Sequence, residues 1–131
     1  MTDTPTQPPA ILIVDDDVEM AALLREAFTR EGFRTVVEFS GRAAIVAATC
    51  EPFDVVVLDK EIPDLNGLDL LRELRARLPD VRLVFLTAFG GSLVARAARK
   101  RGADRYLDKP VRLDDLVATV RAVLGASRRA S

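Results

Sequence analysis

The segment DVVVLDKEIPDLNG, residues 54–67, decides the predicted fold. Residues 55–58 form an unbroken apolar run rich in β-branched side chains, which is typical of a strand buried on both faces. Asp59 follows at the carboxyl end of this run, and the chain then turns through Pro63 and Gly67. Ligands of open α/β sheets bind at the carboxyl ends of strands, so Asp59 is a candidate for chemistry. The alternative is an aspartate that only caps the turn.

Four further strands and five helices are predicted on either side of this segment. The predicted strands are residues 10–14, 34–39, 55–58, 82–86 and 105–107. The predicted helices follow residues 17, 40, 67, 92 and 112, and end at or before Gly32, Pro52, Pro79, Gly102 and Gly125. Strand and helix therefore alternate five times. This order predicts an α/β fold with a parallel sheet and helices on both of its faces.

Local signals mark the ends and the buried side of these helices. Ser40 and Ser92 each precede a helix and are predicted N-caps. Gly102 is predicted to end the fourth helix. Apolar residues at helical spacing predict the face of the first helix that packs on the sheet. These residues are Met20, Leu23, Leu24, Ala27 and Phe28.

Composition limits the possible functions. The sequence has 131 residues and a net charge of −1, which predicts one domain and gives no electrostatic case for binding nucleic acid or a membrane surface. It contains no histidine, so catalysis by Ser-His-Asp or Cys-His sites, His-ligated zinc and phosphorylation on histidine are excluded. Its one cysteine, Cys50, excludes an intramolecular disulfide and suits a reducing compartment.

The two ends of the sequence predict no membrane or secretory segment. No stretch approaches the run of about 20 apolar residues that crosses a bilayer. Residues 1–9 are rich in Thr and Pro and lack the apolar core of a signal peptide, so we expect a disordered leader and a cytoplasmic protein. Residues 10–125 are expected to form the domain, and residues 126–131 a flexible tail.

Polar residues stand just past the carboxyl ends of four predicted strands. Asp15 and Asp16 follow the first strand and Asp59 the third. Thr87 follows the fourth strand and Lys109 the fifth. Because the carboxyl ends of parallel strands share one edge of a sheet, we expect these five side chains to meet in one crevice.

The residue types in this crevice predict phosphoryl transfer. Three neighbouring carboxylates repel one another unless a cation joins them, and ligands that are all oxygen favour a hard cation such as Mg²⁺. A lysine and a hydroxyl supply the charge and the hydrogen bond that a transferred phosphoryl group needs. Asp59 would then be a carboxylate nucleophile. Each residue alone also has a plain structural explanation, as a helix cap, a strand end or a solvated charge.

Four motifs together resemble a known family. They are Ile13-Val14-Asp15-Asp16-Asp17, DKEIPDLNG (residues 59–67), Leu86-Thr87-Ala88 and GADRYLDKP (residues 102–110). With these motifs, the sequence resembles the receiver domain of bacterial two-component response regulators from about residue 10 to residue 125. The resemblance implies a flavodoxin-like, doubly wound, five-stranded parallel sheet of order 2-1-3-4-5, with five helices on both faces.

The resemblance also implies how the acidic residues are used. Asp59 would accept a phosphoryl group from a sensor histidine kinase or a His-containing phosphotransfer protein. Mg²⁺ would be held by the carboxylates of Asp15, Asp16 and Asp59 and by the main-chain carbonyl of Glu61. The domain would catalyse its own phosphorylation and dephosphorylation, and would not otherwise be an enzyme.

Other residues are implied to hold the phosphoryl group and to transmit its presence. Lys109, Thr87 and the amides of Glu61 and Ala88 would contact the phosphoryl oxygens. Tyr106 would be an aromatic switch that turns inward as Thr87 moves toward the phosphate. Phosphorylation would thereby switch a protein-interaction face.

The implied face consists of the fourth helix, the fifth strand and the fifth helix, and would bind a downstream protein target or a second copy of the chain. The fourth helix carries the basic residues Arg96, Arg99, Lys100 and Arg101, which are interpreted first as a solvated face, then as a partner surface, and last as a DNA contact. No output domain follows Gly125 in this sequence. We therefore expect a stand-alone receiver, similar to the chemotaxis regulators, that binds neither DNA nor a membrane directly.

Two other functions remain open at this point. A Mg²⁺-dependent phosphatase with an aspartate nucleophile needs an acid two residues after Asp59, and Glu61 fills that place. The turn through Pro63 and Gly67 fits a receiver better. The second alternative is a degenerate receiver that serves only as a scaffold, and the intact set of polar residues argues against it.

Overall fold

Residues 7–125 are described by the structure, a computed structural model, and they fold around one parallel sheet. The strands lie in the order β2-β1-β3-β4-β5, which confirms the expected fold. Strands and helices alternate along the chain. The elements are β1 (Ala10–Val14), α1 (Val18–Arg30), β2 (Arg34–Glu38), α2 (Gly41–Cys50), β3 (Val55–Asp59), α3 (Gly67–Arg77), β4 (Arg82–Thr87), α4 (Ser92–Lys100), β5 (Arg105–Asp108) and α5 (Leu113–Gly125).

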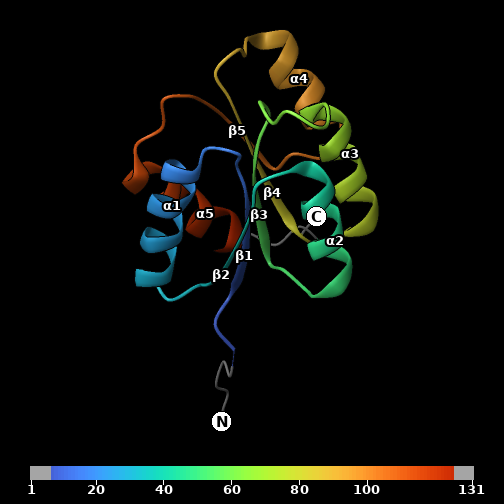
Figure 1. Ribbon diagram of the computed structural model, residues 1–131. Coiled ribbons are helices and arrows are strands. Elements are labelled where there is room, and N and C mark those ends of the chain that lie inside the picture. The colour runs from blue at the N-terminus through green and yellow to red at the C-terminus, as the bar shows by residue number, and fades with distance from the viewer. Residues whose placement is uncertain (1–6, 126–131) are drawn as a thin grey trace.

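The helices cover both faces of the sheet (Figure 1). Helices α1 and α5 lie on one face, and α2, α3 and α4 lie on the other. Successive residues of a strand point to opposite faces, so each central strand contributes to two apolar cores. Ile11 and Val57 belong to the core beneath α1 and α5. Leu12 and Leu58 belong to the core beneath α2, α3 and α4. Burial on both faces explains why β1 and β3 have no polar residue before their carboxyl ends.

The register of the strands brings their carboxyl ends to one edge of the sheet. Val14 pairs with Leu58, and Asp59, the last residue of β3, pairs with Leu86. Thr87, the last residue of β4, pairs with Asp108 at the end of β5. Segments that are far apart in the sequence therefore begin their loops side by side. Any site formed by these loops must lie at this edge.

Side-chain caps fix the start of α1, α2 and α3, and the cap of α3 is Asn66. The carboxylate of Asp17 accepts hydrogen bonds from the amides of Glu19 and Met20 at the start of α1. Ser40 caps α2 through the amide of Ala43, as predicted. The predicted cap at Ser92 is wrong, because Ser92 is already the first residue of α4. The N-cap is Gly91, which has a φ of 121° and no side chain to accept a hydrogen bond.

The buried face of α1 also differs from the predicted one. Met20 and Leu23 are 39% and 48% exposed, whereas Ala21, Leu24 and Phe28 are buried. Apolar residues occupy more than one side of this helix, so spacing alone does not fix which side meets the sheet. Contact with β2 and α5 buries the side that carries Ala21 and leaves two large apolar side chains exposed.

The predicted leader and tail lie mostly outside the described residues. Residues 1–6 and 126–131 are not described. The carbonyl of Pro9 accepts a hydrogen bond from the amide of Arg34, so the chain already contacts β2 one residue before β1 begins. Among residues 7–125, no helix has the length and the apolar character needed to cross a membrane.

Gly67 is required by a close contact at the end of the loop that follows Asp59. A methyl group at this position would lie 2.6 Å from Cα and 2.7 Å from the carbonyl oxygen of Lys60. We expect Gly67→Ala to lower the free energy of unfolding by about 1–3 kcal/mol, because the backbone of the loop must move. Urea unfolding measures this loss. Gly125→Ala is the control, because nothing lies within 4 Å of its added methyl group, and an equal loss in both variants would contradict the prediction.

Candidate functional site

Three carboxylates come together at the carboxyl edge of the sheet. Asp15 and Asp16 follow β1, and Asp59 ends β3. One carboxylate oxygen from each residue lies within 4.8 Å of the others. Asp15 and Asp59 are buried, whereas Asp16 is exposed. The predicted meeting of these three side chains is therefore present in the fold, with one of them facing solvent.

Asp15 is buried, and burial makes its ionised form unfavourable. Its Oδ1 accepts a hydrogen bond from the amide of Asp17 at 2.9 Å. Burial raises the pKa of Asp15 from its ordinary 3.8 to about 6; the bond from Asp17 opposes this shift, and the charge of Asp59 adds to it. A buried, ionised Asp15 beside Asp59 is thus unfavourable unless a cation compensates.

Asp59 is contacted on both of its oxygens. Oδ1 accepts a hydrogen bond from the amide of Glu61 at 3.0 Å, and Oδ2 accepts one from Nζ of Lys109 at 2.8 Å. Burial raises the pKa of Asp59 even though Lys109 and the Glu61 amide favour the charged form. For Lys109, burial acts to lower the pKa, but the hydrogen bond to Asp59 outweighs it and the pKa is raised. One lysine therefore partly neutralises two buried acids.

The side chain of Glu61 takes part in the site in a way that the sequence did not reveal. Its Oε2 accepts a hydrogen bond from the hydroxyl of Thr87 at 2.5 Å, and its Oε1 accepts one from the amide of Ala88 at 3.0 Å. Nζ of Lys109 lies 3.6 Å from Oε1. Burial acts to raise the pKa of Glu61, but the hydrogen bonds from Thr87 and Ala88 and the charge of Lys109 hold it below its usual value.

Thr87 and Tyr106 connect to the loop between β4 and α4. Thr87 is fully buried, and its Oγ1 accepts a hydrogen bond from the amide of Phe89 at 3.0 Å. The hydroxyl of Tyr106 donates to Oδ1 of Asp108 at 2.8 Å and accepts from the amide of Gly91 at 3.2 Å. Tyr106 thus bonds to this loop, whereas Thr87 bonds to both the loop and Glu61.

A cavity of about 410 Å³ opens beside the three carboxylates. Its polar side is formed by the acidic residues and Lys109, and its apolar side by residues of α1, α5, the end of β4 and the loop after β5. The apolar residues are Met20, Leu24, Leu86, Pro110, Val111, Leu113 and Leu116. The buried carboxylate of Asp59 is therefore reachable from outside through a cavity with one charged and one apolar side.

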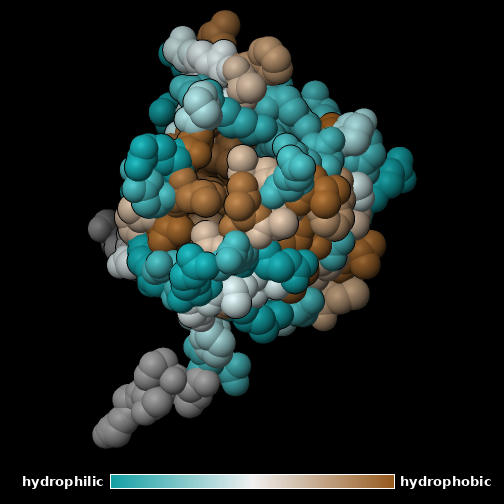
Figure 2. Space-filling model, turned by 60° about the vertical axis from the view of Figure 1, so that its left-hand side comes forward, coloured by the Kyte–Doolittle hydropathy of each residue, from teal (hydrophilic) through white to brown (hydrophobic). Residues whose placement is uncertain are grey.

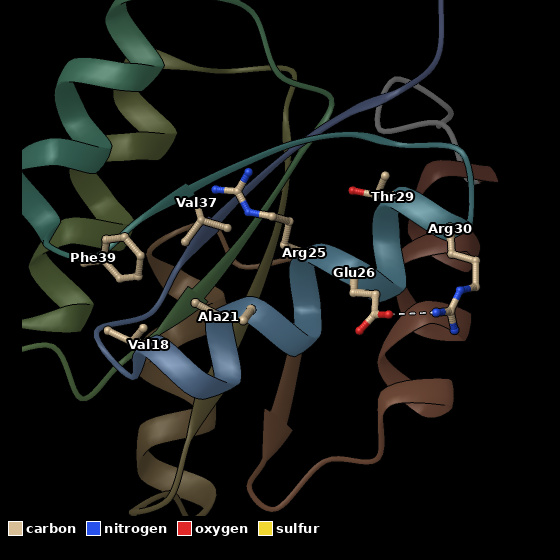
Figure 3. Close-up of a pocket in the computed structure, with 9 residues that line it drawn as sticks. Val18, Ala21, Arg25, Glu26, Thr29, Arg30, Val37 and Phe39 are labelled. Atoms are coloured by element: carbon tan, nitrogen blue, oxygen red, sulfur yellow. Dashed lines mark hydrogen bonds and ion pairs between the residues drawn. The ribbon is translucent and has the colours of Figure 1, made fainter.

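A larger groove, of about 570 Å³, lies between α1 and β2 and does not share any lining residue with this cavity. Figure 2 shows apolar residues gathered on the side of the molecule that comes forward from the left of Figure 1. In Figure 3, Val18, Val37 and Phe39 lie around the groove, and Glu26 pairs with Arg30 at its rim. Glu26 and Arg30 pair with each other along α1, and among the residues that line the groove there is no cluster of carboxylates like that of the acidic site.

A family model describes most of this chain. The model for the response regulator receiver domain matches residues 11–121. The chain belongs to this family. The resemblance suggested by the four sequence motifs is therefore confirmed, and residues 11–121 form a receiver domain of two-component response regulators.

Similar proteins agree with this assignment. The transcriptional regulatory protein CpxR of Klebsiella pneumoniae is 40% identical over 117 residues, which is 89% of this chain and 50% of CpxR. The chain thus spans about half the length of this curated relative. The receiver domain of the Francisella response regulator 1452 superposes with a TM-score of 0.84 at 31% identity, covering 89% of this chain and 97% of that one.

A third protein was solved in a modified state. This response regulator from Burkholderia pseudomallei contains a phosphorylated aspartic acid, a calcium ion and citrate. It is 27% identical and superposes with a TM-score of 0.82, covering 89% of this chain and 69% of that one. Both an aspartyl phosphate and a divalent cation thus occur in a protein with this fold.

The residues of this receiver fit a hard divalent cation. The available donors are carboxylate oxygens: the sequence has no histidine, and its one cysteine, Cys50, ends α2 and is not part of the cluster. Burial, and to a smaller extent the charge of Asp59, raise the pKa of Asp15, and a bound cation would stabilise the ionised form that both effects disfavour. Asp16, the exposed member of the cluster, faces the solvent from which a hydrated cation arrives.

We expect Asp15→Asn to stabilise the receiver when divalent cations are removed. The raised pKa means that the folded state binds the proton of Asp15 more tightly than the unfolded state does, so the fold loses stability as the pH rises from about 4 to about 6 and the full loss is present above that. At pH 8 in EDTA, the variant should gain about 1–3 kcal/mol in free energy of unfolding. This gain should shrink as the pH falls from 6 to 4.

Urea unfolding at pH 8 and at pH 4 measures this difference. Asp16→Asn is the matched control, because Asp16 is exposed and loses little hydration on folding. Excess Mg²⁺ should reverse the order at pH 8 and make the wild type the more stable protein. A loss of stability in Asp15→Asn at pH 8 in EDTA would refute the electrostatic interpretation.

Proposed function

We propose that this receiver domain accepts a phosphoryl group on Asp59 from a sensor histidine kinase or a His-containing phosphotransfer protein, and that phosphorylation switches a protein-interaction face. The observation that carries the proposal is the environment of Asp59. This carboxylate is buried at the edge of an open cavity, and Nζ of Lys109 lies 2.8 Å from its Oδ2. A buried carboxylate with a cation beside it is suited to receive an anionic group.

The transfer has a simple balance of bonds. A carboxylate oxygen of Asp59 forms a bond to phosphorus, while the bond from phosphorus to the imidazole nitrogen of the donor breaks. The electron pair of the breaking bond stays on that nitrogen, which then takes a proton from solvent. Lys109 neutralises negative charge on the transferring group. The contact between Oδ1 and the Glu61 amide fixes the orientation of the nucleophile.

Mg²⁺ is the cofactor we assign to the acidic cluster. The carboxylates of Asp15, Asp16 and Asp59 and the main-chain carbonyl of Glu61 would hold it, in line with the oxygen-only donor set. When bound, the ion supplies positive charge that offsets the repulsion between the carboxylates and the phosphoryl oxygens. The buried Asp15, held by the amide of Asp17, orients the cluster.

After transfer, three groups would bind the phosphoryl oxygens: the ammonium of Lys109, the hydroxyl of Thr87 and the amide of Ala88. Thr87 is the group that transmits the change, because its Oγ1 also accepts the amide of Phe89. A shift of Thr87 therefore pulls on the loop that leads into α4. Tyr106 bonds to the same loop, which makes it the switch residue in this proposal.

The proposed output face is the surface of α4, β5 and α5. Leu93, at the start of α4, is 77% exposed, and Phe89, in the loop before it, is 73% exposed. Exposed apolar residues on an element tied to the site suit a downstream protein target or a second copy of the receiver. We infer that the chain itself does not bind DNA directly and that it works in the cytoplasm with its kinase.

The phosphatase alternative is less well supported. It requires Glu61 to act as a general acid, which must hold a proton near neutral pH. The pKa of Glu61 is lowered, and its carboxylate accepts hydrogen bonds from Thr87 and Ala88. We therefore infer that the receiver catalyses only its own phosphorylation and dephosphorylation.

Acetyl phosphate tests the phosphoacceptor. With Mg²⁺, the wild type should gain the mass of one phosphoryl group, because Asp59 can attack a small acyl phosphate as well as a phosphohistidine. Asp59→Asn and wild type in EDTA should gain none, and intact-mass spectrometry measures all three. Equal labelling of wild type and Asp59→Asn would place the modification elsewhere and overturn the assignment.

Gly90→Ala tests the position of Tyr106. A methyl group at residue 90 would overlap the hydroxyl of Tyr106 and the carboxylate of Asp108, so the tyrosine must leave its place. Two hydrogen bonds of about 1 kcal/mol each are then lost, and the free energy of unfolding should fall by about 1–2 kcal/mol. Tyr106 is the only tyrosine and the chain has no tryptophan, so intrinsic fluorescence reports its movement. Gly125→Ala should leave the spectrum unchanged, and an unaltered spectrum in Gly90→Ala would count against this position of the ring.

A further inference from the structure

The carboxylate of Glu61 sits among the same three donors that the proposed function assigns to the phosphoryl oxygens. The Thr87 hydroxyl lies 2.5 Å from Oε2, the Ala88 amide 3.0 Å from Oε1, and Nζ of Lys109 3.6 Å from Oε1. We call these three donors the anion cradle. An anionic side chain of the chain itself therefore already fills the place that a phosphoryl group would need.

We propose that Glu61 is an internal occupant of the anion cradle, which an incoming phosphoryl group must displace, and that it thereby sets how tightly the receiver binds that group. This inference rests on the proposed function. Glu61 is a positioning residue in this account, because it acts through Thr87, Ala88 and Lys109.

The two anions cannot be bound by the cradle at the same time. The hydroxyl of Thr87 has one hydrogen to donate, and so has the amide of Ala88. Both hydrogens point to Glu61. Lys109 has three donors, but one of them is already used by Asp59. A phosphoryl group on Asp59 can gain the full set of hydrogen bonds only after the carboxylate of Glu61 has left.

The surroundings of Glu61 hold its side chain in the cradle and also allow the side chain to be displaced. Its amide is bonded to Asp59, so its backbone is fixed beside the cradle and its side chain has the length to reach in. The side chain is 27% exposed and therefore borders solvent. Nζ of Lys60 lies 3.9 Å from Oε2 and offers a cationic neighbour outside the cradle. Displacement thus requires rotation of one side chain and no movement of the backbone of β3.

Occupation of the cradle lowers the apparent affinity for the phosphoryl group. The apparent Kd of a ligand equals its intrinsic Kd divided by the fraction of protein whose site is free. A carboxylate that occupies the cradle lowers this fraction and so raises the apparent Kd. The negative charge of Glu61 also repels the incoming anion, with or without a contact. The experiment must therefore distinguish the effect of an occupied cradle from the effect of the negative charge of Glu61.

Three proteins separate these two effects: wild type, Glu61→Gln and Glu61→Asp. The glutamine has the same length without the charge, and its neutral hydrogen bonds are about half as strong. The aspartate keeps the charge, but it is shorter by one methylene group and cannot reach Thr87 and Ala88 from the same backbone position. Glu73→Gln is the control for charge, because Glu73 is on α3 and pairs with Arg77.

The beryllium trifluoride anion, an analogue of a phosphoryl group that attaches to a carboxylate, is the probe. Its binding in the presence of Mg²⁺ is measured by isothermal titration calorimetry on the full chain. Both Glu61→Gln and Glu61→Asp should bind it more tightly than wild type, by about tenfold for the former, because the cradle is free or more weakly held. Glu73→Gln should match wild type.

Two results would overturn the inference. If Glu61→Asp binds like wild type while Glu61→Gln binds more tightly, charge alone explains the effect. If neither variant binds more tightly, Glu61 does not compete. Asp59→Asn must abolish binding in every background, and residual binding there would instead refute the proposed function.

A measurement without any anion tests the cradle independently of phosphorylation. In ¹H–¹⁵N spectra, the amides of Ala88 and Phe89 should shift in both Glu61 variants and not in Glu73→Gln. The Ala88 amide loses its carboxylate acceptor, and the Phe89 amide senses the change at Thr87. Unchanged signals in both Glu61 variants would show that Glu61 does not occupy the cradle. This result would overturn the inference regardless of how tightly beryllium trifluoride binds.

Discussion

The contact between Asp59 and Lys109 is the interaction on which the rest of the site depends. It joins the ends of β3 and β5 across β4, at a distance of 2.8 Å between Nζ and Oδ2. The order of the strands places β3 at the centre of the sheet, where its last residue is buried between two helical layers. A carboxylate in such a place must have a cationic partner, and Lys109 is the partner that the topology provides.

One lysine does not balance the charge of this edge. Asp15 and Asp59 are both buried, and the pKa of Asp15 rises to about 6 mainly because of burial. The fold therefore holds two carboxylates in buried positions where their ionisation costs stability. Such a cost is characteristic of sites that bind cations and is not needed by the sheet itself, whose strands are held by apolar cores on both faces.

Much of this arrangement could be predicted from the sequence, because it depends on strand ends. Short apolar runs define the strands, and the polar residues that follow them must meet at one edge, so the position of Asp15 beside Asp59 was predicted without a structure. The buried face of α1, the cap of α4 and the partners of the Glu61 side chain were not predicted correctly. The cap at Ser92 failed because Ser92 is already the first residue of α4 and Gly91 is the N-cap. The partners of the Glu61 side chain depend on the path of the loop between β3 and α3. The sequence offered one signal for these contacts: Glu61 is an acidic residue two positions after Asp59, and it could pair with Lys109.

The hydrogen bonds of Glu61 change how the switch should be understood. If the cradle were empty before phosphorylation, Thr87 would move because a new anion attracts it. With Glu61 in place, Thr87 already donates to an anion, and its Oγ1 already holds the amide of Phe89. Under the proposal for Glu61, phosphorylation then exchanges one anion for another at the same three donors. The free energy available to move the loop before α4 is the difference between these two sets of contacts, because a ligand shifts an equilibrium only by its differential affinity for the two states.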